Sequence, residues 1–155
     1  MPDLIPLWIS IKVALISTII VSILGIFICR TLYKRKGHAT QFLESLILLP
    51  MVLPPTVLGF ILIIIFSPRT FVGQFFQNIL HLPVVFTMTG AVIASVIVSF
   101  PLMYQHTIQG FRSINPKMLN TARTMGASER KIFYRLILPL SKRSIIAGIM
   151  MSFAR

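Results

Sequence analysis

Long apolar segments alternate with shorter polar ones along this chain. Apolar residues dominate 9–29, 42–66 and 83–104, and a fourth apolar stretch begins at Ser144. A helix rises about 1.5 Å per residue, so about 20 apolar residues cross the roughly 30 Å hydrocarbon core of a bilayer. The pattern therefore predicts an all-α fold, a polytopic bundle of transmembrane helices forming one domain over residues 1–155.

The fourth apolar stretch, residues 144–155, has about half the length that a membrane crossing needs. We expect an incomplete span there, so that the chain is either a fragment or a truncated product.

Prolines interrupt the second span. Pro50, Pro54 and Pro55 all fall inside 42–66. Proline removes a backbone hydrogen bond and clashes with the preceding turn, so we expect a kinked or locally unwound helix. The freed carbonyl groups need partners from other helices or water. The Pro54–Pro55 region should therefore lie inside a bundle or against a cavity.

The connection after this span carries a helical pattern of its own. Apolar residues recur on one helix face at Val72, Phe75, Phe76, Ile79 and Leu80. Thr70 precedes them and can cap the start of a helix. The pattern predicts a short helix that lies in the membrane interface.

The longest polar excursion covers residues 105–143. Asn115 followed by Pro116 predicts the start of a short helix at 116–125, and Gly126 suits the left-handed position after its end. Ser128 can cap a second helix, which we expect to stop before Pro139. Most connections are far shorter than this one. Two capped helices therefore predict a docking element for a partner outside the membrane rather than a plain loop.

Composition and charge strengthen the membrane interpretation. Of the 155 residues, 55% are hydrophobic and 12% are charged, with a net charge of +12. Such a charge would suggest nucleic acid in a soluble protein, but basic loops of membrane proteins mark the cytoplasmic side. The loop 30–41 and the segment 105–143 are basic, whereas the connection 67–82 holds Arg69 as its one charge. We predict an outside N-terminus, cytoplasmic basic loops, lipid contact and no nucleic-acid partner.

Residues for catalysis or cofactor binding do not group in the sequence. No G-x-x-x-x-G-K-[ST] motif occurs, so we expect no ATP binding through a P-loop. The three histidines are scattered and offer no metal-ligand spacing. The three acidic residues, Asp3, Glu44 and Glu129, lie in different segments of the chain. We therefore expect no two of them to act together as a general acid and a general base. The sequence predicts neither an enzyme, nor a metal site, nor a cofactor.

The polar segment resembles the EAA loop of ABC-importer permeases. The resemblance rests on Asn120-Thr121-Ala122, Gly126 four residues later, and the run Ile137-Leu138-Pro139, with Asn120 in place of the usual glutamate and Thr121 in place of the first alanine. In that family the first helix of the loop seats in a groove of the ATP-binding subunit. The resemblance implies these ATPase-contact residues: Asn120, Thr121, Ala122, Gly126, Ala127, Leu138 and Pro139.

Other segments are similar to molybdate permease subunits, which are type I ABC-importer permeases. These are the Leu-Pro-Pro-Thr-Val-Leu-Gly run at 53–59 and the Ser-Phe-Pro-Leu-Met run at 99–103. The resemblance implies a prokaryotic plasma-membrane importer that works by alternating access. Its partners would be a second permease copy, an ATP-binding ABC subunit and an extracytoplasmic oxyanion-binding protein. Pro54, Pro55 and Thr56 would form part of the pathway wall, with a simple packing kink as an equal alternative.

Three other functions stay open from the sequence. Molybdate, tungstate and sulfate are all tetrahedral dianions, so a sulfate or thiosulfate permease is one alternative. A non-transporting, membrane-anchored protein that uses its basic loop for binding is a second, and an inactive remnant of a permease is a third.

Overall fold

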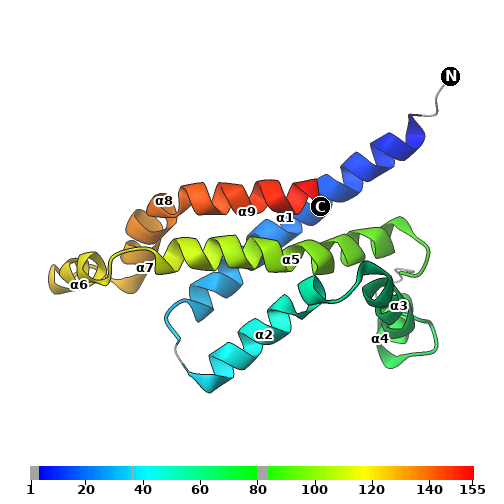
Figure 1. Ribbon diagram of the computed structural model, residues 1–155, viewed down its shortest axis with the longest axis horizontal. Helices are drawn as coiled ribbons and strands as arrows, with labels where there is room; N and C mark the ends of the chain where they lie inside the picture. The colour runs from blue at the N-terminus through cyan, green and yellow to red at the C-terminus, as the bar shows by residue number, and fades with distance from the viewer. Residues whose placement is uncertain (1–3, 36, 80–83) are drawn as a thin grey trace.

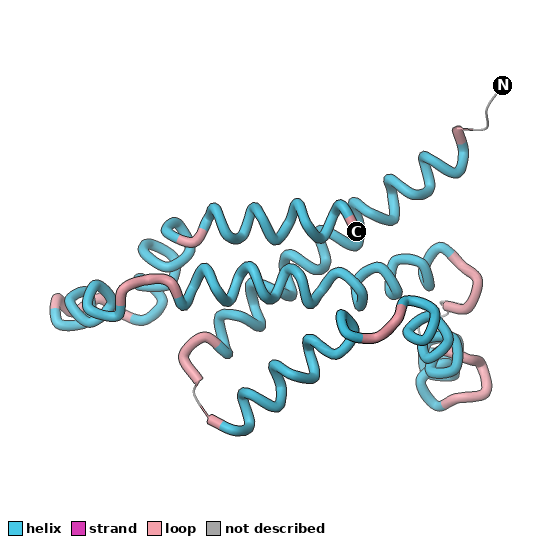
Figure 2. Tube along the Cα trace, viewed as in Figure 1, coloured by secondary structure: helices cyan, strands magenta, loops and turns pink. Residues whose placement is uncertain are grey.

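The chain folds into helices joined by short turns. The computed structural model describes residues 4–35, 37–79 and 84–155, and these ranges contain no strand (Figure 2). The expectation of an all-α fold is confirmed.

Three long helices lie side by side and form the body of the molecule (Figure 1): α1 (Ile5–Leu32), α5 (Met88–Arg112) and α9 (Lys142–Ala154). Small residues let α5 approach the other two closely. A Cβ atom on Gly25 would lie 2.8 Å from the Met103 side chain, and one on Gly110 would lie 2.6 Å from Ser144 Cβ. Close backbone approach at small residues is the usual way in which helices pack in a membrane.

The outer faces of these helices are apolar. On α1, the exposed fractions of Ile19, Ile23 and Phe27 are 59%, 64% and 64%. α1 and α5 are each long and apolar enough to cross a membrane, and up to four spans result if each bent helix pair counts as one. An apolar surface of this extent suits lipid rather than water. α1 extends beyond the expected range 9–29 at both ends, whereas α5 begins later than the expected range 83–104, at Met88, and continues past its end to Arg112.

The second apolar stretch is broken at Pro54 and Pro55, as the sequence predicts, whereas Pro50 lies within a continuous helix. It forms α2 (His38–Val52) and α3 (Pro55–Ile65), which are bent by 111° relative to each other. Leu53 and Pro54 are extended between them, each with a ψ of 139°, and Pro55 opens the next helix. This bend is much sharper than a kink within one continuous helix.

A helix is present where the sequence predicts one, and its place in the membrane interface stays a prediction. The helix consists of α4 (Phe71–Gln74) and the π-helical segment η1 (Phe75–Ile79). The hydroxyl of Thr70 caps α4 by accepting a hydrogen bond from the Gly73 N–H at 3.2 Å. Leu80, the last residue of the predicted pattern, lies outside the described residues.

The polar excursion begins later than expected, because α5 continues past Pro101 and Tyr104 to Arg112. Four short elements then follow: α6 (Pro116–Thr124), α7 (Glu129–Ile132), the π-helical η2 (Phe133–Ile137) and α8 (Leu138–Leu140).

The expected helix end before Pro139 is wrong. Pro139 lies within α8, and the chain turns by 66° only at Ser141, between Glu129–Leu140 and Lys142–Ala154. A proline ring normally clashes with the carbonyl group four residues earlier in an α-helix. The wider π-helical turn of η2 precedes Pro139 and gives the ring more room.

Candidate functional site

The most elaborate polar structure is the projecting pair formed by α6 and the α7–η2–α8 arm, which we call the helix pair (residues 115–141). Its caps form where the sequence places them. The Asn115 Oδ1 accepts from the Lys117 N–H at 2.9 Å, and the Ser128 hydroxyl accepts from the Lys131 N–H at 3.4 Å. Gly126 adopts a φ of +80°, which favours glycine. These caps fix both short helices and the turn between them.

The inner side of the helix pair packs on the body. Leu119, Ile132, Phe133 and Ile137 are buried there. The Phe133 ring meets the Phe111 ring of α5 edge-on, with centroids 5.7 Å apart. The Arg30 guanidinium of α1 lies 4.7 Å from the centroid of the same ring. Phe133 therefore contacts both α1 and α5, and the cation–π contact adds to its packing.

A chain of polar contacts also joins α1 to α6. Glu129 pairs with Lys34 at the end of α1, and it accepts a hydrogen bond from Arg123 Nε at 2.8 Å. Arg123 Nη1 donates in turn to the Asn120 Oδ1 at 2.7 Å. The hydrogen bonds from Lys34 and then Arg123 hold the pKa of the Glu129 carboxyl below its ordinary value of 4.5. Because the Glu129 side chain is 51% exposed, these contacts orient the helices more than they stabilise them.

One face of α6 and of the turn after it carries two exposed methionines. Met118 is 45% exposed and Met125 is 81% exposed. Thr121 and Ala122 lie between them, so the four residues follow the i, i+3, i+4, i+7 spacing of one helix face. We call Met118, Thr121, Ala122 and Met125 the α6 stripe. Sequence reasoning missed its two methionines, although the same spacing was available in the sequence.

The predicted contact residues fall on two separate elements. Asn120, Thr121 and Gly126 are exposed on α6 and its C-terminal turn, and Ala122 and Ala127 are half-buried there. The Ala127 N–H donates to the Ala122 carbonyl at 3.0 Å and closes this turn. Leu138 and Pro139 instead belong to α8, where Leu138 is half-buried and Pro139 is exposed.

The second candidate region is the bend between α2 and α3. Pro54, Pro55 and Thr56 are all exposed at this bend. Pro55 borders a hollow of about 180 Å³ that also touches Ala94 of α5. Their role as a pathway wall stays a prediction.

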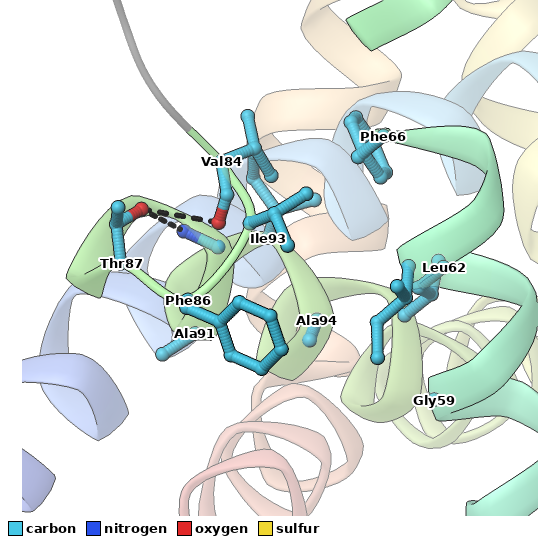
Figure 3. Close-up of a pocket in the computed structure, with 12 residues that line it drawn as sticks. Gly59, Leu62, Phe66, Val84, Phe86, Thr87, Ala91, Ile93 and Ala94 are labelled. Atoms are coloured by element: carbon cyan, nitrogen blue, oxygen red, sulfur yellow. Dashed lines mark hydrogen bonds between the residues drawn. The ribbon is translucent and has the colours of Figure 1, made fainter. Parts of the chain in front are cut away.

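A larger pocket of about 330 Å³ lies between α3 and the start of α5. Figure 3 shows Leu62 and Phe66 of α3 on one side of it and Ile93 and Ala94 of α5 on the other. The hydroxyl of Thr87 at its rim donates to the Val84 carbonyl at 3.0 Å. An apolar lining of this kind suits an apolar group better than an anion, which would lose its hydration there.

Metal ligands do not gather anywhere in the described part of the chain. Within residues 4–35, 37–79 and 84–155, no group of three or more His, Cys, Asp or Glu side chains could hold a metal ion.

The fold and the site define a class: a multi-helix membrane protein whose spans carry a projecting, capped helix pair. Comparison with known families agrees with this class. The family described as "Binding-protein-dependent transport system inner membrane component" matches residues 21–155. The chain belongs to this family.

Related proteins point to molybdenum transport by their names. The permease protein YvgM of Bacillus subtilis, whose name assigns it to molybdenum transport, is 42% identical over 150 residues, which cover 97% of this chain and 66% of YvgM. The molybdenum transport system permease protein ModB of Azotobacter vinelandii is 30% identical over 152 residues, or 98% of this chain and 67% of ModB. The protein cysT of Chlorokybus atmophyticus, whose name assigns it to sulfate transport, is 28% identical over 147 residues, or 95% of this chain and 51% of cysT. The chain therefore spans about two thirds of the length of these molybdenum permeases.

Proposed function

We propose that this chain is the membrane-spanning permease part of an ATP-driven importer for a tetrahedral oxyanion, and that the oxyanion is molybdate. The family membership supports the importer. The relative named for molybdenum transport in Bacillus subtilis is 42% identical, against 28% for the one named for sulfate transport, and this difference favours molybdate.

In this proposal the chain is a single transmembrane domain in a prokaryotic plasma membrane. Its N-terminus lies outside and the helix pair lies in the cytoplasm. The charge pattern supports this orientation, because cytoplasmic loops carry an excess of lysine and arginine. A second permease copy completes the pathway, and an extracytoplasmic binding protein delivers the anion.

ATP hydrolysis occurs on a separate subunit that docks on the α6 stripe. The two exposed methionines suit such a contact, because flexible thioether side chains adapt to a partner surface. When the ATPase subunits close, they displace α6. The attachment of the helix pair to both α1 and α5 passes this displacement to the spans and alternates access to the anion.

One observation carries the proposal: Phe133 lies 4.7 Å from the guanidinium of Arg30 on α1 and 5.7 Å from the ring of Phe111 on α5. A plain loop that only connects two spans would not need contacts with both α1 and α5. These contacts make the helix pair one mechanical unit with the spans, which is what transmission of a motion requires.

Co-purification with the cognate ATP-binding subunit tests the proposal. Met125→Glu should abolish the association, because it places a charge at an 81% exposed position of the docking stripe without disturbing the core. Met125→Leu is the matched control and should retain it. If the unaltered chain fails to associate in any nucleotide state, the proposed function is wrong. If the association instead weakens steeply with added salt and is unaffected by Met125→Glu, the result would support the alternative of a non-transporting, membrane-anchored protein that binds through its basic loop.

A further inference from the structure

An open apolar groove lies at the elbow where α8 meets α9. Its volume is about 300 Å³. These residues line it: Ile26, Leu138, Pro139, Lys142, Ile145 and Ile146. Ile26 belongs to α1, so the groove runs between α1 and the elbow. All of the lining residues except Lys142 are apolar.

The elbow separates the basic segment Glu129–Leu140 from the largely apolar helix Lys142–Ala154. The chain turns there by 66°, and the Ser141 hydroxyl holds the turn by donating to the Gly110 carbonyl at 2.9 Å. Lys142 and Arg143 begin α9, and the rest of that helix is apolar apart from Ser144 and Ser152. A boundary of this kind is typical of the headgroup level of a bilayer, where cations meet lipid phosphates and apolar side chains meet acyl chains.

Among the residues that the structure describes, the cations at the elbow have no acidic partner. Residues 4–35, 37–79 and 84–155 contain two carboxylate side chains, and both are engaged elsewhere. Glu44 pairs with Arg112, while Glu129 pairs with Lys34 and Arg123. Lys142 and Arg143 are exposed. The elbow therefore presents uncompensated positive charge directly beside an apolar groove.

We propose that this groove binds one anionic phospholipid, with an acyl chain along Ile26, Ile145 and Ile146 and the phosphate beside Lys142 and Arg143. The groove is already open in this structure and is lined by side chains of both α1 and α9, so a lipid can enter it without any rearrangement of the helices. A water-soluble anion would make no use of the apolar lining. The bound lipid holds the elbow at the membrane boundary and fixes the direction in which the helix pair leaves it.

Lipid titration followed by native mass spectrometry tests this site on the whole chain in detergent micelles. Phosphatidylglycerol should remain bound as one molecule per chain, whereas phosphatidylcholine should dissociate. Lys142→Gln should weaken phosphatidylglycerol binding about fivefold, which is the contribution of one cation near an anionic lipid. Lys117→Gln removes the same charge from the exposed surface of α6, away from the groove, and should leave binding unchanged.

A second variant tests the groove separately from the charge. Ile146 is 53% exposed, so Ile146→Trp should leave the fold intact, as thermal unfolding can verify, and its indole should fill the groove and displace the lipid. The proposal is overturned if both phospholipids bind equally, if Lys117→Gln and Lys142→Gln have the same effect, or if Ile146→Trp retains the lipid. It is also overturned if Ile146→Trp converts a dimer to a monomer, because a second copy would then occupy the groove. These results do not depend on whether an ATPase docks on α6.

Discussion

The helix pair and the α2–α3 arm are attached to the body in different ways. The helix pair buries Leu119, Ile132, Phe133 and Ile137. Within α2 and α3, by contrast, Thr40 and Leu58 are the buried residues. Figure 1 shows the same contrast: α5 and α9 run alongside each other with α1 crossing them obliquely, whereas α2 diverges from α5 and α3 is turned across its end.

This difference in side-chain burial fits two different roles, transmission of motion for the helix pair and surface contact for the α2–α3 arm. A segment that transmits motion has to be stiffly joined to the spans, and the packed inner side of the helix pair meets that need. The α2–α3 arm instead leaves Pro54, Pro55 and most of its apolar side chains exposed in the single chain. Surfaces of this kind suit contact with lipid, with a second copy or with a transport pathway.

The largest effect should come from Phe133→Ala. Loss of a buried phenylalanine typically costs about 3 to 5 kcal/mol, and here the contacts with Arg30 and Phe111 are lost as well. We expect a free energy of unfolding in mild detergent that is lower by this amount, together with loss of ATPase association. Phe71→Ala is the matched control, since Phe71 is 85% exposed and should change stability by no more than about 0.5 kcal/mol. Equal effects of the two substitutions would show that Phe133 does not anchor the helix pair to the body.

A glycine comparison should give the next largest effect. A Cβ atom at Gly126 meets nothing within 4 Å, yet its φ of +80° strains any other residue. Gly126→Ala should therefore destabilise by about 1 to 2 kcal/mol. Gly59 in α3 also has open space around it, and Gly59→Ala should be neutral or stabilising by up to about 1 kcal/mol. Denaturant unfolding of both variants measures the difference, and a stabilising Gly126→Ala would refute the left-handed cap.

An ion pair joins α2 of the α2–α3 arm to the end of α5. Arg112 Nη2 lies 2.5 Å from Glu44 Oε1, and the two side chains are 45% and 22% exposed. A double-mutant cycle with Glu44→Gln and Arg112→Gln should give a coupling energy of about 0.5 to 1 kcal/mol. Amide hydrogen exchange in α2 should become faster in each variant, while exchange in α6 stays the same. Unchanged exchange in α2 would show that apolar contacts alone hold the arm.

The smallest effect concerns the pH dependence of the helix pair. The pKa of Glu129 is lowered from 4.5 by Lys34 and Arg123, so the contacts of this carboxylate stabilise the fold above that pH. Their contribution is lost as the pH falls through the folded-state pKa. Because Glu129 is exposed, we expect only a few tenths of a kcal/mol. The free energy of unfolding, measured from neutral pH to below 4.5, should lack this pH-dependent contribution in Glu129→Gln. An identical pH dependence in both proteins would show that the Glu129 contacts make no such contribution.

The local features of the fold could be predicted from the sequence. Asn115, Gly126 and Ser128 act on backbone groups only a few residues away, so their caps follow from residue type and spacing. The break at Pro54–Pro55 follows from the missing backbone donors.

The long-range features could not be predicted in the same way. The 111° angle at that break and the π-helical turn before Pro139 depend on how the helices pack. The pairing of Lys34 with Glu129 and the position of Arg30 beside Phe133 join segments that are far apart in the chain. No local pattern encodes such contacts, because tertiary packing determines them.

Cysteine labelling in cells tests the location of the helix pair most directly. The single native cysteine, Cys29, is buried and gives little background. Lys117→Cys places an accessible thiol on α6, and Arg69→Cys places one on the connection predicted to lie outside. A membrane-impermeant maleimide should label Arg69→Cys in intact cells, and Lys117→Cys only after the membrane is opened. Labelling of Lys117→Cys in intact cells would place α6 outside, where no cytoplasmic ATPase could reach it, and would contradict the account.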